Sequence, residues 1–190
     1  MARTVNPKAE KQRRTHIVQA AYHAIYQRGY ASVTLSDIAQ QAGVAKGTLV
    51  YYFGSKEGLF KEVLQRFVRT ITVATTRAVR QQGTTEDRLK VFVENQFYGL
   101  LNTKRFYTVY LDFLSASTKV YELRLLTQML FDNTDMLKVG IARTPEQAKL
   151  MRAVLDGLAI QFLFDDQADL NQYREECMRA MQALLTLDPP

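Results

Sequence analysis

The chain has 190 residues, 47% of them hydrophobic, which is enough for the core of one medium domain or of a small head joined to a larger body. No window approaches 18 consecutive apolar residues, which argues against a transmembrane span. The net charge of +6 lies entirely in residues 1–56, where eight basic residues face two acidic ones, while the rest carries 17 of each sign. A basic head on a neutral body favours a polyanion partner over a basic tail kept for solubility.

Helical periodicity begins in the head, and neither an alternating strand pattern nor an Asn-Gly hairpin signal appears. Helices are expected at about 9–28, 34–42 and 45–52, and a longer one follows from about 55 to 83. Thr34 and Asp37 are spaced as a capping box at the start of the second helix.

The body continues with helices at about 84–102, 103–115, 117–140, 145–165 and 169–185. Thr144, Pro145 and Gln147 form a strong start for the fourth of these. The prediction is an all-α fold of about nine helices, with a three-helix head at 1–54 and a helical body at 55–190.

Residues 34–53 have the spacing of a helix-turn-helix. Ala39 is small where a partner helix must cross closely, Gly43 can adopt positive φ at the turn, and Leu49 can anchor the second helix on the first. An ordinary αα-hairpin is the alternative, but the basic charge of this segment favours a DNA-binding motif.

The head resembles the tetracycline-repressor (TetR) family over residues 11–65. The resemblance rests on the segments Thr34-Leu35-Ser36-Asp37-Ile38-Ala39, Ala42-Gly43-Val44, Lys46-Gly47-Thr48-Leu49, Tyr52-Phe53, Ser55-Lys56 and Leu59-Phe60. In the body, Asp156-Gly157-Leu158 resembles the choline-responsive BetI-type subgroup. The resemblance implies a cytoplasmic homodimeric repressor with a ligand-binding and dimerisation body, which releases operator DNA when a small-molecule effector binds.

The resemblance also implies which residues contact DNA. The helix at 45–52 enters the major groove, so Lys46, Gly47 and Thr48 face base edges. The residues implied in phosphate or minor-groove contacts are Arg13, Arg14, Thr34, Ser36, Tyr51, Tyr52 and Lys56. Thr34 can equally be a cap alone, and Tyr52 can equally pack inward. Val50 departs from the family, since many members carry Tyr there, which puts one DNA contact in doubt.

The last two predicted helices are apolar around more than one face, so they must bury more than one side. In the resembling family the corresponding helices form a four-helix dimer interface, which implies a homodimer through about 146–186. A monomeric core pair is the alternative.

The middle of the body is rich in aromatic residues, which either form core or line a small-molecule pocket. The candidate pocket residues are Phe97, Phe106, Tyr110, Phe113, Phe131 and Phe162. Glu94, Asp112 and Asp156 lie within apolar stretches, and a carboxylate beside tyrosines suits a cationic ligand. A solvated helix face explains each acid equally well.

Catalysis finds little support in the sequence. The two histidines, His16 and His23, share one helix face and are expected at its surface, and Cys177 is expected as a small buried hydrophobe. No phosphate loop, metal-ligand spacing or signal peptide appears, so no enzyme activity, metal or cofactor is predicted. The competing functions are a nonspecific nucleic-acid binder, and a ligand-binding or scaffolding protein that has lost operator recognition.

Overall fold

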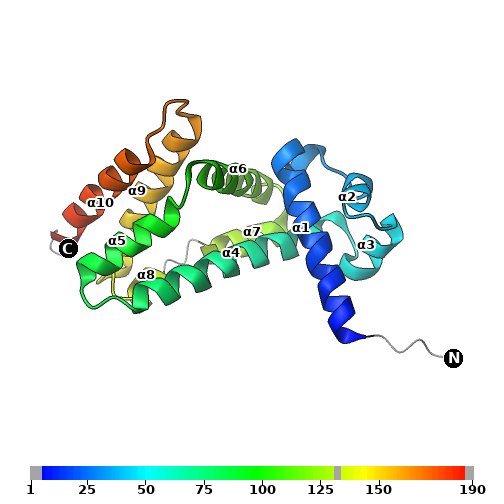
Figure 1. The fold of residues 1–190 in the computed structure, drawn as a ribbon, viewed down its shortest axis with the longest axis horizontal. Helices are drawn as coiled ribbons and strands as arrows, with labels where there is room; N and C mark the ends of the chain where they lie inside the picture. Colours follow the sequence, from blue (N-terminus) through cyan, green and yellow to red (C-terminus); the bar gives the residue numbers. More distant parts are fainter. Residues whose placement is uncertain (1–5, 131–133, 187–190) are drawn as a thin grey trace. The chain divides into compact units, whose positions relative to one another are not determined.

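The computed structural model describes residues 6–130 and 134–186, which contain ten helices and no strand. The helices are α1 (Pro7–Ser32), α2 (Leu35–Gln41), α3 (Lys46–Phe53), α4 (Lys56–Arg80), α5 (Thr85–Gln96), α6 (Leu100–Ser117), α7 (Tyr121–Leu130), α8 (Thr134–Lys138), α9 (Pro145–Phe164) and α10 (Leu170–Thr186). The all-α prediction is confirmed, and Figure 1 shows the helices in chain order.

About nine helices were expected and the described residues contain ten, since both α7 and α8 fall within the range 117–140 that was expected to be one helix. The helix before them also extends further than expected, to Ser117.

Two compact units divide the chain. The first comprises Met1–Phe67 with Leu111–Leu126, and the second comprises Val68–Tyr110 with Thr127–Pro190. The boundaries fall inside helices, so α4, α6 and α7 each carry the chain from one unit into the other. This division by contacts differs from the functional division at residue 54, which stays a prediction.

The core of the first unit forms where α1, α2 and α3 meet. Ile17, Ala21 and Ile25 of α1 are fully buried, as are Ile38 of α2 and Leu49 of α3. Thr34 and Asp37 make the predicted capping box at the start of α2. Gly43 has φ +61°, so the turn between α2 and α3 uses the backbone freedom expected of glycine there.

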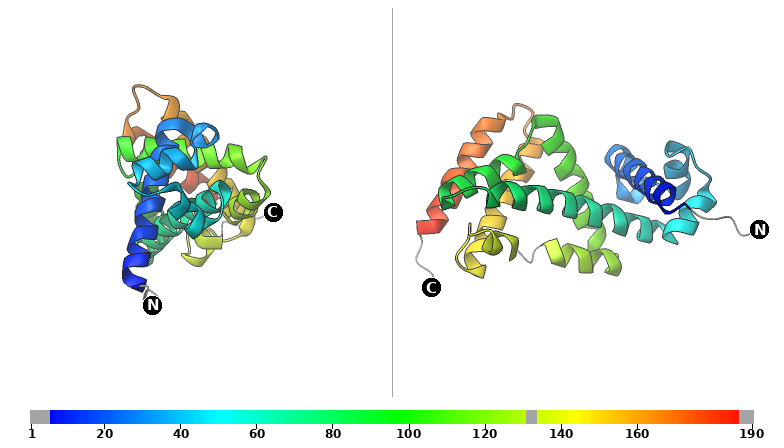
Figure 2. Two further views of the ribbon diagram at one scale, coloured as in Figure 1. Left: turned by 90° about the vertical axis from the view of Figure 1, so that its right-hand side faces the viewer. Right: turned by 60° about the horizontal axis from the view of Figure 1, so that its bottom comes forward.

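The second unit is built around α9 and α10, which lie side by side with α5 against α10 (Figure 2). Phe97, Phe162 and Tyr173 form an aromatic cluster between these helices, with ring centroids 5.1–6.5 Å apart. Thr144 caps α9 as predicted, and the Gln147 amide donates to the Leu184 carbonyl at 2.9 Å.

Candidate functional site

The outer face of α3 is the main exposed feature of the head. Leu49 is fully buried, whereas Val50 is 45% and Tyr51 76% exposed. Lys46 and Gly47, at the start of the helix, are also exposed. The N-cap residue Ala45 supplies no side-chain hydrogen bond. One side chain therefore anchors α3, while its first turn and outer face remain available to a ligand.

The start of α2 is already capped from within the chain. The Thr34 hydroxyl accepts a hydrogen bond from the Asp37 amide at 3.2 Å and donates to the Asp37 carboxylate at 2.7 Å. The hydrogen bonds from Thr34, reinforced by Arg28 at 2.5 Å, lower the pKa of Asp37. The Thr34 side chain thus acts as a cap, whereas Ser36 is exposed. A phosphate contact at either residue stays a prediction.

The tyrosines at the end of α3 differ in environment. Tyr51 is exposed, whereas Tyr52 is half-buried and stands edge-on to Tyr51, with the ring centroids 5.1 Å apart. Tyr52 also contacts the ring of Phe53. Only Tyr51 is fully accessible to a phosphate in this structure.

Lys56 points into the protein, unlike the surface residue that the resemblance implies. Its ammonium donates to the Tyr30 carbonyl at 2.7 Å and lies 4.8 Å from the centre of the Tyr30 ring and 5.6 Å from that of Phe60. Burial lowers the pKa of Lys56. Its role in this structure is to close the end of α1, and a phosphate contact stays a prediction.

Tight local geometry sets the turn from α3 into α4. The Gly58 amide donates to the Ser55 hydroxyl at 3.1 Å, so Ser55 caps α4. A Cβ at Gly58 would lie 2.1 Å from the Phe53 carbonyl oxygen, closer than any real side-chain contact. Glycine at 58 therefore lets α4 begin directly after α3 without a clash against the Phe53 carbonyl.

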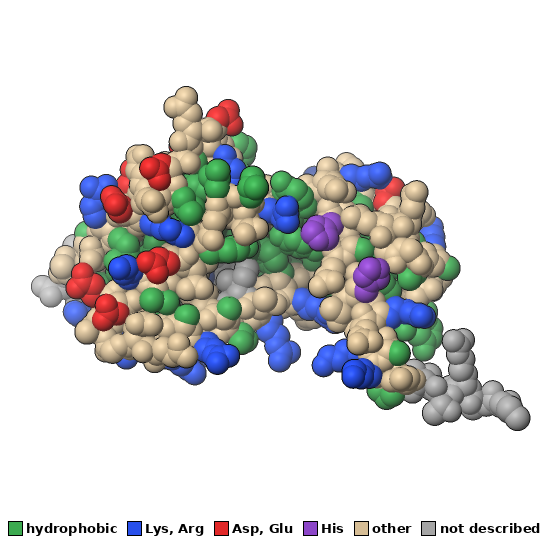
Figure 3. Space-filling view, viewed as in Figure 1, with side chains coloured by type: hydrophobic (Ala, Val, Ile, Leu, Met, Phe, Trp, Pro, Cys, Tyr) green, Lys and Arg blue, Asp and Glu red, His purple; other side chains and the backbone are tan. Residues whose placement is uncertain are grey.

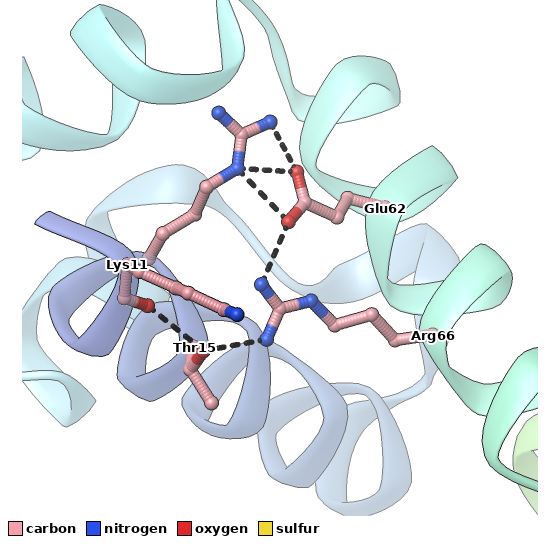
Figure 4. Close-up of polar contacts among 5 residues, drawn as sticks. Lys11, Thr15, Glu62 and Arg66 are labelled. Carbon is pink, nitrogen blue, oxygen red and sulfur yellow. Dashed lines mark hydrogen bonds and ion pairs between the residues drawn. The ribbon is translucent and has the colours of Figure 1, made fainter. Parts of the chain in front are cut away.

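Two neighbouring arginines of α1, Arg13 and Arg14, also differ. Arg13 is exposed, whereas Arg14 is half-buried and bonds to Glu62 of α4 (Figure 4). The Arg14 guanidinium carbon also lies 5.1 Å from the centre of the Phe53 ring. Glu62 is a site residue that the sequence reasoning missed, because it lies 48 residues from Arg14.

His16 is a second residue that the sequence reasoning missed. Its Nε2 lies 3.1 Å from the Ala42 carbonyl oxygen at the end of α2. Because a carbonyl only accepts, this nitrogen must carry the proton. His16 is exposed on its helix, as expected, and in addition bonds to the end of α2. Both histidines are visible on the face drawn in Figure 3 (purple).

Five of the six predicted pocket residues lie within the described part of the chain. Phe97 and Phe162 belong to the aromatic cluster of α5, α9 and α10, with ring centroids 5.8 Å apart. Phe106 stacks on Tyr110 at 6.0 Å within α6. Phe113 packs on Phe60 in the first unit, and Phe131 lies outside the described residues. A pocket lined by these residues stays a prediction.

A polar cluster in the second unit surrounds Asp156 of α9. Its oxygen Oδ1 lies 4.0 Å from Arg152 and has no hydrogen-bond partner among the described residues. Burial raises the pKa of Asp156, although Arg152 and Tyr110 oppose that rise. Burial likewise raises the pKa of Tyr107 and Tyr110, so both hydroxyls stay protonated.

Within residues 6–130 and 134–186, no group of three His, Cys, Asp or Glu side chains is placed to hold a metal ion. None of the described helices is both long and apolar enough to cross a membrane. Cys177 is buried, which raises the pKa of its thiol to about 12.

Comparisons with known proteins point to one family. Residues 17–63 match the profile described as bacterial regulatory proteins, tetR family. The HTH-type transcriptional regulator BetI of Stenotrophomonas maltophilia is 29% identical over 157 residues, which cover 78% of this chain and 80% of the relative. A transcriptional regulator from Rhodococcus sp. Rha1 shares the fold, with a TM-score of 0.81 at 19% identity over 93% of this chain and 99% of its own. A regulator from Saccharomonospora viridis, solved in complex with choline, has a TM-score of 0.75 at 26% identity over 90% and 96%.

Proposed function

The chain is a DNA-binding transcriptional regulator of the tetR family, and from this premise we propose that it represses its target genes. Two copies bind an inverted-repeat operator in the cytoplasm, and a small effector releases them. The observation that carries the proposal is the exposed first turn of α3, held in place by the buried Leu49. A short helix presented in this way can enter the major groove, where Lys46 and Thr48 would read base edges.

Dimerisation is proposed through a second copy packed on α9. An apolar stripe at helical spacing is exposed along this helix, with Leu150 at 50%, Ile160 at 39% and Phe164 at 75% exposure. Ala153 and Gly157 lie on the same stripe and allow another helix to approach closely. Two heads joined in this way would reach half-sites about one turn of DNA apart.

For the effector we propose a small organic cation bound beside Asp156. The carboxylate has one buried oxygen without a hydrogen-bond partner among the described residues. The side chains of Tyr107 and Tyr110 lie near this carboxylate, and the centroids of their two rings are 5.9 Å from each other. Aromatic faces and a desolvated carboxylate both attract cations. The choline bound by the Saccharomonospora viridis regulator is a cation of this class, which supports the proposal.

We propose that α6 transmits the effect of effector binding from the second unit to the head. This helix carries Tyr110 in the second unit and, two residues later, Asp112 in the first unit. The Asp112 carboxylate accepts a hydrogen bond from the Tyr30 amide at 3.3 Å, close to the end of α1. An effector that favours the non-binding arrangement by about 1–3 kcal/mol would weaken operator binding accordingly.

The first experiment selects fragments of sheared host genomic DNA with the purified protein at about 0.15 M salt, where weak phosphate attraction is screened. We expect one inverted repeat to be enriched, and Lys46→Ala to abolish the enrichment. Broad recovery without a shared motif would contradict the proposal and favour a nonspecific binder. Equal enrichment by Lys46→Ala would contradict the assignment of base reading to this residue.

The second experiment titrates the complex with the selected operator. Choline is compared with 3,3-dimethylbutan-1-ol, its neutral carbon analogue of the same shape. We expect the cation to release the DNA, the neutral analogue to be much weaker, and Asp156→Asn to remove the difference. Equal release by both compounds, or release by neither, would overturn the proposed cation site.

A further inference from the structure

One carboxylate in the head receives two guanidinium groups from different places in the sequence. Glu62 of α4 accepts hydrogen bonds from the Arg14 Nε at 2.7 and 2.9 Å and from its Nη2. The same carboxylate lies 3.1 Å from the Arg66 Nη2, one turn along α4. Glu62 is well shielded, with 15% of its side chain exposed, whereas Arg14 keeps 44% exposure. Figure 4 shows the group of contacts.

The cluster continues to the main chain of α1. Arg66 donates through Nη1 to the Thr15 hydroxyl at 2.8 Å, and that hydroxyl donates to the Lys11 carbonyl at 2.9 Å. Every one of these residues belongs to the first unit. The result is a fixed joint between α1 and α4 in which two arginines share one acid, so a net positive charge remains.

Arg14 is fixed on one edge only. Its Nε and Nη2 are bonded to Glu62, while its Nη1 makes no hydrogen bond with any described residue. The guanidinium lies over the ring of Phe53, the last residue of α3. The nearby Tyr52 is one of the groups that raise the pKa of Arg14, after Glu62. The remaining edge of a guanidinium is suited to a phosphate oxygen, because its donors form a rigid planar fork.

We propose that Glu62 is a positioning residue for operator DNA, holding Arg14 against the end of the recognition helix so that its free edge meets a backbone phosphate. A flexible arginine side chain loses much conformational entropy when it binds a phosphate. A side chain that is already held in place loses less. The inference rests on the proposed operator binding, but it assigns to an acidic residue a role in binding a polyanion.

The negative charge of Glu62 makes the inference testable. By charge alone, removing an acid near DNA should strengthen binding, because one repulsion disappears. By positioning, removing Glu62 should weaken it. Glu57, in the first turn of the same helix, has no ion pair among the described residues, so Glu57→Gln is a matched control for charge alone.

The experiment measures operator affinity over a range of salt for wild type and for Glu62→Gln, Glu57→Gln, Arg14→Gln and the double variant Arg14→Gln with Glu62→Gln. We expect Glu62→Gln to weaken binding about two- to tenfold, the change that corresponds to ordering one flexible side chain. Glu57→Gln should bind as tightly as wild type or more tightly. Arg14→Gln should weaken binding and reduce the salt slope by about one ion.

The double variant separates positioning from general damage. If Glu62 acts through Arg14, adding Glu62→Gln to Arg14→Gln causes no further loss. An equal loss in both backgrounds, or binding by Glu62→Gln at least as tight as wild type, would overturn the inference. Failure of wild type to prefer its selected operator over unrelated DNA would instead overturn the proposed function, so the two failures are distinguishable.

Discussion

The Lys56 ammonium and the Tyr30 carbonyl form a 2.7 Å hydrogen bond between the start of α4 and the end of α1. The last carbonyls of a helix have no partner within it, and a cation there also interacts favourably with the helix dipole. On its other side, the Tyr30 amide donates to Asp112. The preceding residue, Gly29, breaks the helix with φ +75°. Three segments of the first unit therefore meet at Tyr30.

Replacing Lys56 by Met keeps most of the apolar stem but removes the charge. We expect the free energy of unfolding to fall by about 1–3 kcal/mol, because a charge-assisted hydrogen bond and two ring contacts are lost together. Lys61→Met, at an exposed position one turn along α4, should change it by less than about 0.5 kcal/mol. Denaturant titration measures both. A weaker operator affinity for Lys56→Met with unchanged stability would restore the phosphate contact that the resemblance implied.

His16 holds the turn that precedes α3. Its Nε2–H donates to the Ala42 carbonyl, so His16→Ala should lower the free energy of unfolding by about 0.5–1.5 kcal/mol. His23 lies on the same helix, is exposed, and contacts only the ring of Tyr22 among the interactions observed. His23→Ala therefore serves as the control in the same denaturant titrations. Equal losses would show that helix propensity, rather than the bond to Ala42, sets the effect.

The head could be predicted from sequence because its signals are local. Thr34 and Asp37 are three residues apart, Gly43 marks the turn by its backbone freedom, and Leu49 lies six residues later. These features all lie within about 15 residues of chain, so their spacing alone reveals them. The caps at Ser55 and Thr144 were predictable for the same reason.

The residues that the sequence concealed depend on distant partners. Arg14 and Glu62 are 48 residues apart, and Lys56 and Tyr30 are 26 apart, so no local pattern distinguishes them from ordinary surface charges. Similarly, aromatic content could not separate Phe113, which packs on Phe60, from Phe162, which packs on Phe97. Only the tertiary arrangement decides which rings meet.

The buried carboxyl of Asp156 should make stability depend on pH. Burial raises its pKa in the folded state, despite the opposing effects of Arg152 and the Tyr110 hydrogen bond. The folded state therefore holds this proton more tightly, and the stability gained is complete below the ordinary pKa of an aspartate. It is lost as the pH rises through the folded pKa.

Asparagine at 156 remains neutral and removes this dependence. We expect the difference in free energy of unfolding, wild type minus Asp156→Asn, to be larger near pH 4 than at pH 7. Urea titrations of both proteins at the two pH values give the difference directly. A difference that does not change with pH would show that Asp156 pays no desolvation penalty when ionised.

Gly157 is the final test, because its effects on the single chain and on the dimer have opposite signs. A glycine inside a helix costs roughly 0.5–1 kcal/mol relative to alanine, and a Cβ at this position would meet nothing within 4 Å of the same chain. In an isolated chain, Gly157→Ala should therefore raise stability. If a second α9 crosses there, the added methyl must instead be accommodated at a close contact, at a cost of about 1–3 kcal/mol.

Sedimentation across a range of concentrations measures the outcome. We expect Gly157→Ala to raise the dissociation constant of the dimer roughly five- to a hundredfold, the range that corresponds to that cost. Gly83→Ala, in the turn before α5, also introduces a methyl into open space and should leave association unchanged. An unchanged dimer for Gly157→Ala, together with a more stable chain, would place the contact between copies away from this part of α9.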